Sequence, residues 1–173
     1  MRFHPTALSG VTVIEPSPVS DDRGHFARLY CPDEFARAGI DFAPTQTSLS
    51  FNRRRHTLRG MHFCLEPEAK LVRCTRGRIF DVAVDIRRDS TTFRRWFGVE
   101  LDPVQASGLY IPPGVAHGFL TLEPDSDVIY QIDRRYRPGF DAGLRWNDPQ
   151  FAIHWPVMPA VIDPRDRDYP DFV

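Results

Sequence analysis

The polar side chains best able to do chemistry gather in four short stretches, each expected to lie between strand-like apolar runs. The stretches are Asp22-Arg23-Gly24, Leu58 to Phe63, Ile111 to Phe119 and Arg145 to Pro149. Two of them carry a histidine, and imidazole is the side chain that ordinarily changes protonation state near neutral pH. A lone histidine is more often structural than functional. The stretches therefore indicate candidate proton-transfer groups that other elements must bring together.

Lys70 stands out by composition. Of the 22 basic side chains 21 are arginine, and Lys70 is the only lysine. An arginine bias can reflect genome composition, but only lysine offers a compact ammonium whose pKa can be tuned. Composition alone leaves chance and function as equal explanations of Lys70.

The size of the chain predicts a single domain, residues 1–173. A chain of 173 residues with 42% hydrophobic residues can bury a core without disulfides or a structural metal. The formal net charge of −1 argues against a nucleic-acid partner that is recognised through a general basic surface.

The sequence predicts a cytoplasmic protein. No apolar run is long enough to span a membrane, and the first residues lack the pattern of a signal peptide. Three cysteines without CxxC spacing favour reduced thiols over a disulfide framework.

Apolar periodicity predicts a mainly β fold with short peripheral helices. The best helix candidate is Pro32 to Ala38, with acidic residues in its first turn and Gly39 as a stop. Many close antiparallel strands in one domain indicate a sandwich, barrel or jelly roll. The expected strands are Val11 to Glu15, Phe26 to Tyr30, Thr45 to Phe51, Leu71 to Cys74, Ile79 to Ile86, Phe97 to Leu101, Leu109 to Ile111, Phe119 to Leu122 and Val128 to Ile132.

The strand at Ile79 to Ile86 carries two carboxylates on one face. Phe80, Val82, Val84 and Ile86 alternate with Asp81, Ala83 and Asp85. Such a polar face usually meets solvent, and the alternative is a polar barrel interior.

Taken in order, these motifs resemble the dTDP-4-dehydrorhamnose 3,5-epimerase family over nearly the whole chain. Each motif is weak alone, but the ordered set with matching spacings is specific. Besides the four polar stretches, the matching residues are Lys70-Leu71-Val72, Phe80 to Asp85, Trp96, Tyr130, Tyr136-Arg137-Pro138, Arg165-Asp166 and Pro170.

The resemblance implies a double-stranded β-helix, or cupin-like jelly roll, in a homodimer where an N-terminal segment completes the partner's sheet. It implies epimerisation of a nucleotide-linked 4-keto-6-deoxyhexose at C3 and C5 through an enolate, in a route to L-rhamnose or another deoxysugar. No metal or other cofactor is implied.

The resemblance also assigns roles to individual residues. His62 matches the base, Asp166 the carboxylate that orients it, Lys70 the cation near the enolate oxygen, and Tyr130 the acid on the opposite face. Asp81 is expected in the same cavity, paired with Lys70 or positioning it. The residues expected to bind substrate are Arg23, Phe26, Gln46, Arg59, Asp81, His117 and Tyr136.

Several departures leave alternatives open. Arg28, Ser48 and Cys64 stand where the family often has glutamate, asparagine and glutamine, near substrate-binding positions, so the nucleobase and the particular sugar stay open. A 3- or 5-monoepimerase would share the catalytic set. A metal-dependent cupin enzyme, using His62, Cys64, Glu68 and His117 as ligands, is a second class, and a noncatalytic sugar-nucleotide binding module is a third.

Overall fold

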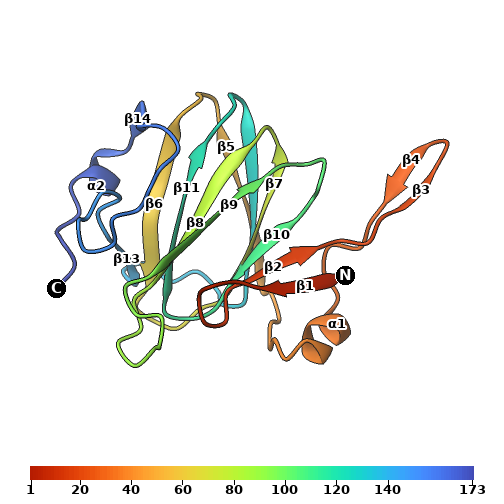
Figure 1. The fold of residues 1–173 in the computed structure, drawn as a ribbon, viewed down its shortest axis with the longest axis horizontal. Coiled ribbons are helices and arrows are strands. Elements are labelled where there is room, and N and C mark those ends of the chain that lie inside the picture. The colour runs from red at the N-terminus through yellow and green to blue at the C-terminus, as the bar shows by residue number, and fades with distance from the viewer.

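The computed structural model describes all residues 1–173, and its main body is two facing β-sheets (Figure 1). The first sheet has the order β1 (Arg2–Pro5), β2 (Thr12–Glu15), β10 (Gly108–Ile111), β7 (Lys70–Arg76), β12 (Ser126–Ile132), β5 (Gln46–Asn52). The second has the order β13 (Asp141–Gly143), β6 (Thr57–Cys64), β11 (Val115–Thr121), β8 (Ile79–Asp85), β9 (Trp96–Leu101), with β14 (Val161–Ile162) beside β6. This arrangement confirms the predicted mainly β, cupin-like jelly roll.

Two short helices, α1 (Pro32–Arg37) and α2 (Pro164–Arg167), lie outside the sheets. The sequence signals for α1 are confirmed, since Pro32 opens it and Phe35 is its buried residue. No helix of the chain is both long and apolar enough to cross a membrane.

The alternation along β8 separates the two faces of its sheet. Ala83 belongs to the apolar core between the sheets, whereas Val82 and Val84 belong to a second cluster on the outer face. Asp81 and Asp85 share the inward face and are fully buried. The polar-interior interpretation of this strand is therefore confirmed, because a period of two places Asp81 and Asp85 on the side of Ala83.

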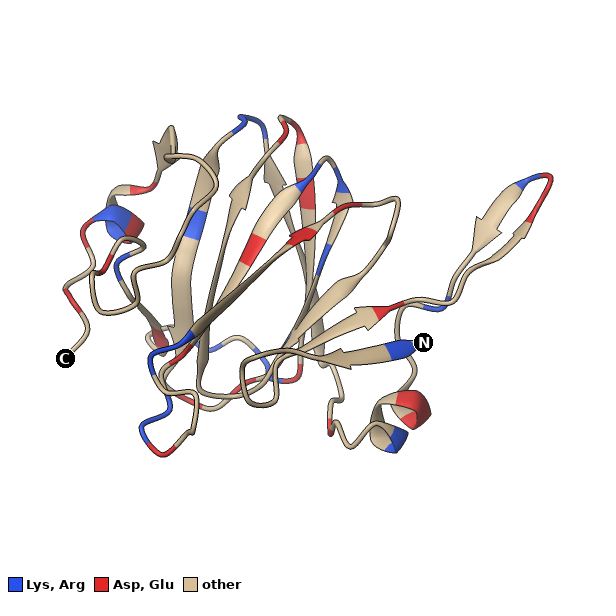
Figure 2. Cartoon of the chain, in the orientation of Figure 1, with Lys and Arg blue, Asp and Glu red and all other residues tan.

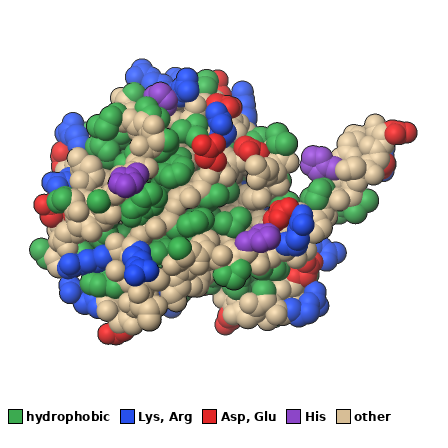
Figure 3. All heavy atoms as spheres, viewed as in Figure 1, with side chains coloured by type: hydrophobic (Ala, Val, Ile, Leu, Met, Phe, Trp, Pro, Cys, Tyr) green, Lys and Arg blue, Asp and Glu red, His purple; other side chains and the backbone are tan.

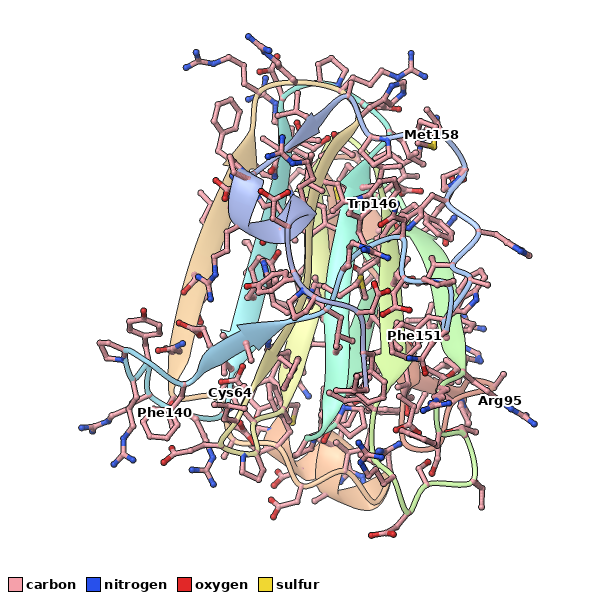
Figure 4. The ribbon with its side chains drawn as sticks, turned by 90° about the vertical axis from the view of Figure 1, so that its left-hand side faces the viewer. Cys64, Arg95, Phe140, Trp146, Phe151 and Met158 are labelled. Atoms are coloured by element: carbon pink, nitrogen blue, oxygen red, sulfur yellow. The ribbon has the colours of Figure 1, made fainter.

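The outer face of each sheet is covered by segments outside the strands. Phe35 of α1 packs with Ile14, Leu71 and Tyr110 of the first sheet. The C-terminal segment crosses the second sheet and contributes Leu144 and other apolar side chains to its outer cluster (Figure 4). Both sheets are thus covered on two faces, which explains why every residue of β10 and β11 is buried instead of every second one.

A hairpin of β3 (Val19–Asp21) and β4 (Gly24–Phe26) projects away from the body (Figures 1 and 3). We call residues 19–26 the arm. Its tip carries acidic and basic residues (Figure 2), and Val19 and Phe26 are 74% and 80% exposed. The predicted strand from Phe26 to Tyr30 is wrong: β4 ends at Phe26, and the following residues join the arm to α1.

The polar stretch from Leu58 to Phe63 lies inside β6 and not between strands, which corrects the expectation from the sequence. The stretch from Ile111 to Phe119 likewise enters β11 at Val115. β6 pairs with β11 with His62 opposite His117. Apolar alternation did not predict β6 because Arg59, Gly60 and His62 interrupt the pattern. Arg59 and His62 line the cavity, where a binding site needs polar side chains.

Gly60 allows β6 and β11 to approach closely at this point. Its φ of +122° is a conformation that other residues rarely adopt, and an added Cβ would lie 2.5 Å from the Cα of Gly118. Because the obstructing atom is backbone, the strands themselves would have to separate.

We expect Gly60→Ala to lower the free energy of unfolding by about 2–4 kcal/mol, from backbone strain plus overpacking. Gly139→Ala is the matched control, because Gly139 also has a positive φ of +88° but nothing lies within 4 Å of its added Cβ. Urea unfolding of both variants measures the difference. Equal losses would contradict the close-approach explanation.

Candidate active site

A cavity of about 610 Å³ opens between the strands of the two sheets. Its walls come from β5, β6, β7, β11 and β12 and from the segment after β12. The volume lies in the range of small-molecule sites. The sequence-predicted residues that line it are Gln46, Arg59, His62, Lys70, His117, Tyr130 and Tyr136.

His62 and Asp166 form a hydrogen-bonded pair at one wall. The Nε2 atom of His62 lies 2.7 Å from a carboxylate oxygen of Asp166, whose other oxygen accepts from the Gly60 amide at 2.9 Å. Because an ionised carboxylate only accepts, Nε2 carries the proton and Nδ1 is left as the basic nitrogen. Burial raises the pKa of Asp166, but the hydrogen bonds from His62 and Gly60 outweigh it, so the pKa lies below its ordinary value. The pair therefore keeps a negative charge beside the imidazole.

Helix α2 positions Asp166. β14 runs parallel to β6, pairing Val161 with Thr57, and delivers the chain to the helix start beside His62. Asp163 caps α2 by accepting from the Arg165 amide at 2.9 Å, and Pro164 occupies the first turn. The short Asp-Pro-Arg-Asp run thus fixes one carboxylate as a cap and turns the other toward β6.

His117 and Tyr130 meet deeper in the cavity. The ring of His117 is 5.8 Å from that of Tyr130 in an edge-on arrangement, and its Nε2 atom lies 2.7 Å from the Asp81 carboxylate. Burial, reinforced by the negative charge of Asp81, raises the pKa of Tyr130 well above its ordinary value, although Arg59 acts in the opposite direction. The phenol of Tyr130 is therefore held in its protonated form.

Lys70 pairs with Glu68 and not with Asp81, which corrects the predicted partner. The Nζ atom of Lys70 lies 3.0 Å from a carboxylate oxygen of Glu68. Lys70 is in the first sheet, whereas Asp81 is in the second, where it is paired with His117. Asp81 is fully buried behind His117 and outside the lining of the cavity.

The lining of the cavity is rich in cations. Six lining residues are arginine or lysine and three are glutamate or aspartate. Arg59 is oriented by Asn52, whose side-chain oxygen accepts from its Nε at 2.7 Å. Gln46 accepts from the amide of Tyr136 at 2.9 Å and so ties the segment after β12 to β5. This excess of positive charge suits an anionic ligand.

Besides Asp81, two predicted binding residues, Arg23 and Phe26, do not line the cavity of this chain. Both lie on the arm, where Arg23 pairs with Asp21, its Nε lying 3.1 Å from the carboxylate. Of the three residues that depart from the family pattern, Ser48 and Cys64 line the cavity. The third, Arg28, lies outside the lining and pairs with Glu34 at 3.2 Å.

Sequence reasoning missed the cluster of charges in the cavity lining. The additional lining residues include Glu66, Arg134, Arg135, Arg137, Asp141 and Arg165. Glu66 pairs with Arg137 at 2.8 Å and with Arg134 at 3.4 Å. The available signal was three arginines within four residues directly after a strand, on both sides of Tyr136.

The metal-dependent alternative needs His62, Cys64, Glu68 and His117 as one ligand set. No group of three or more His, Cys, Asp or Glu side chains in the chain is placed to hold a metal ion. His62, Glu68 and His117 are instead paired with Asp166, Lys70 and Asp81. The ligand set is therefore not assembled.

The fold and the site together define a jelly-roll enzyme with titratable groups in its cavity and an excess of cationic side chains in the cavity lining. The family model for dTDP-4-dehydrorhamnose 3,5-epimerase matches residues 5–173. A dTDP-4-dehydrorhamnose 3,5-epimerase of Methanothermobacter thermautotrophicus is 40% identical over 172 residues, covering 97% of this chain and 92% of the relative. The chain belongs to the dTDP-4-dehydrorhamnose 3,5-epimerase family and is an isomerase of the carbohydrate epimerase class.

Two further comparisons bear on substrate and outcome. The structure of dTDP-4-dehydrorhamnose 3,5-epimerase from Bacillus anthracis, with TDP and PPi bound, matches with a TM-score of 0.95 at 35% identity and covers 99% of both chains. A dTDP-4-dehydrorhamnose 3-epimerase of Streptomyces niveus is 37% identical over 171 residues, covering 97% of this chain and 82% of the relative. Relatives of similar identity thus include both a double and a single epimerase.

We expect Asp166→Asn to fold and to lower kcat by about 10²- to 10⁴-fold, because a neutral amide neither fixes the imidazole tautomer nor stabilises its protonated form. Asp163→Asn is the matched control, since asparagine caps a helix as well as aspartate. Steady-state kinetics with thermal melts measures both variants. An Asp166→Asn enzyme with the kcat of the parent would contradict a catalytic role for the pair.

Proposed function

We propose that a single cupin-like domain, residues 1–173, epimerises dTDP-4-dehydro-6-deoxy-D-glucose at C3 and C5, giving dTDP-4-dehydro-L-rhamnose. The observation that carries the proposal is the His62–Asp166 pair, 2.7 Å apart, in a cavity that Lys70 and Tyr130 also line. Family membership supports the substrate class, and the cationic lining suits a diphosphate.

The first step is removal of a proton from the carbon next to the C4 ketone. Nδ1 of His62 takes the proton as the C–H bond breaks, and the electron pair moves into a C=C bond while the ketone oxygen gains negative charge. Lys70 stabilises that oxygen, and Asp166 stabilises the imidazolium. The product of this step is an enolate with the proton held on His62.

Tyr130 returns a proton to the carbon from the opposite face of the ring. Its raised pKa keeps the phenol protonated across the physiological range, so the proton is available for donation. Solvent then restores the protonation states. Applied to C3 and to C5, the same two steps invert both centres without a redox cofactor.

A single epimerisation is the second candidate, and the 3-epimerase relative is the observation that favours it. The same catalytic groups would serve, because the outcome depends on which reprotonation the bound ring allows. Position-specific exchange of the C3 and C5 protons separates the two candidates.

We expect chelator-treated protein in deuterium oxide to exchange both the C3 and the C5 protons of dTDP-4-dehydro-6-deoxy-D-glucose, followed by NMR. His62→Ala should abolish exchange because no base remains. Tyr130→Phe should lose more of the rate of inversion than of the rate of proton exchange. His62 can still return a deuteron to the face from which it took the proton. Exchange at one carbon alone would replace the double epimerase with a monoepimerase, and no exchange by the folded parent enzyme would refute the proposal.

We also propose that the enzyme is a cytoplasmic homodimer in which the arm of one subunit completes the site of the other. Arg23 and Phe26 match substrate-binding positions but lie outside the cavity of their own chain. Phe26 and Val19 on the arm, and Leu49 and Phe51 on β5, are large exposed apolar side chains. Such exposure is typical of surfaces that a partner covers.

We expect subunit mixing to test this arrangement. Arg23→Ala removes a guanidinium from the arm and His62→Ala removes the base, so each homodimer should be nearly inactive. A refolded equal mixture should recover about a quarter of the parent activity, because half of the dimers are mixed and each holds one intact site. Arg53→Ala, which alters an exposed residue outside the cavity, is the matched control. Failure to recover activity, with a dimer shown by sedimentation, would place Arg23 in its own subunit's site.

A further inference from the structure

The loop between β6 and β7, residues 65–69, carries two glutamates with different partners. Glu66 pairs with Arg134 and Arg137 on the segment after β12, whereas Glu68 pairs with Lys70 at 3.0 Å. Figure 4 shows the start of this loop, where Cys64 lies near Phe140 at the end of β6. The predicted roles of the site residues leave Glu68 without a function.

Lys70 presents a positional problem that Glu68 answers. A lysine ammonium stands on a flexible four-carbon stem, and holding it in one place costs side-chain entropy. The side chains of Lys70 and Glu68 are only 12% and 17% exposed, so their ion pair is screened by little water. Lys70 takes part in no other ion pair in the chain.

The loop that carries Glu68 is itself fixed. The Ala69 amide donates to the Asp133 carboxylate at 2.8 Å, and the Asp133 amide donates back to the Ala69 carbonyl at 3.2 Å. At the other end of the loop the Leu65 amide donates to the Phe140 carbonyl at 2.9 Å. Glu68 therefore lies between two backbone attachments to the segment after β12, which contributes to the cavity lining.

We propose that Glu68 is a positioning residue that holds the ammonium of Lys70 where the enolate oxygen forms. This proposal rests on the proposed function. An ammonium has three N–H donors, so one can bind Glu68 while the others remain for the ketone oxygen. Glu68 also lines the cavity, and its proposed contribution is to fix Lys70 before the proton moves.

The first test uses the fact that Lys70 is the only lysine. Protein grown with ¹³C,¹⁵N-lysine gives one lysine side-chain spin system, so NMR observes Lys70 directly and without turnover. The two Hε protons of Lys70 should have separate chemical shifts and restricted motion in the parent protein. The same is expected in Glu68→Gln, because its amide oxygen can still accept a hydrogen bond. In Glu68→Ala they should merge and become mobile. A Lys70 side chain that is equally ordered in all three proteins would overturn the proposal.

The second test is kinetic. Glu68→Ala should lower kcat at least about tenfold with KM changed less than about threefold, and Glu68→Gln should restore most of kcat. In a Lys70→Ala background Glu68→Ala should have no further effect, because the partner that it positions is gone. Glu100→Ala, at an exposed ion pair outside the cavity, is the control.

The outcomes separate the two proposals. Additive losses in the double variant, or a higher kcat in Glu68→Ala, would overturn the positioning role. A parent enzyme that exchanges neither proton would refute the proposed function, and the spectrum of Lys70 would still decide whether Glu68 fixes its side chain.

Discussion

The carboxylate of Asp166 joins parts of the chain that are 104 residues apart, and the geometry of the site depends on it. One oxygen accepts from His62 and the other from the backbone of Gly60, so the carboxylate binds the side chain and the strand that carries it. Three further features serve this contact: the parallel pairing of β14 with β6, the cap at Asp163, and the glycine that lets β6 lie against β11. His62 is thus held by its own strand, β6, and by elements near the C-terminal end of the chain.

The pKa values of two groups in the site, Asp166 and Tyr130, are shifted in opposite directions, and this difference separates their roles. Hydrogen bonds lower the pKa of Asp166 despite its burial, so it stays charged beside the imidazole. Burial and the nearby charge of Asp81 raise the pKa of Tyr130, so it stays neutral with a proton to donate. Asp166 thus supplies a negative charge beside His62, whereas Tyr130 holds a proton. His117 links the two walls, since it lies opposite His62 on β6 and contacts the ring of Tyr130.

Much of the architecture could be predicted from the sequence, because β8 shows apolar alternation and strands such as β7 and β12 contain compact apolar runs. β6 could not, since Arg59 and His62 interrupt its apolar pattern to serve the cavity. The partner of Lys70 could not be predicted either. Lys70 and Asp81 lie in different sheets, and Asp81 is already paired with His117 on the neighbouring strand. Only the structure shows these two facts, which leave Glu68 as the partner of Lys70. The roles of the site residues came from the ordered motifs, and the structure supplies the distances that composition and period cannot contain.

The arm carries two residues, Arg23 and Phe26, that match substrate-binding positions but do not reach the cavity of their own chain. Arg23 is almost fully exposed and makes its ion pair with Asp21 on its own hairpin, so nothing in its own subunit uses its charge for binding. Phe26, also on the arm, is 80% exposed, and the proposed partner subunit would cover it. The cavity, by contrast, is lined by His62, Lys70 and Tyr130 of the same chain, and Asp166 is hydrogen-bonded to His62. The groups proposed for proton transfer thus all come from one chain, whereas Arg23 and Phe26 could reach a cavity only in a second subunit, which is the arrangement that the proposed homodimer supplies.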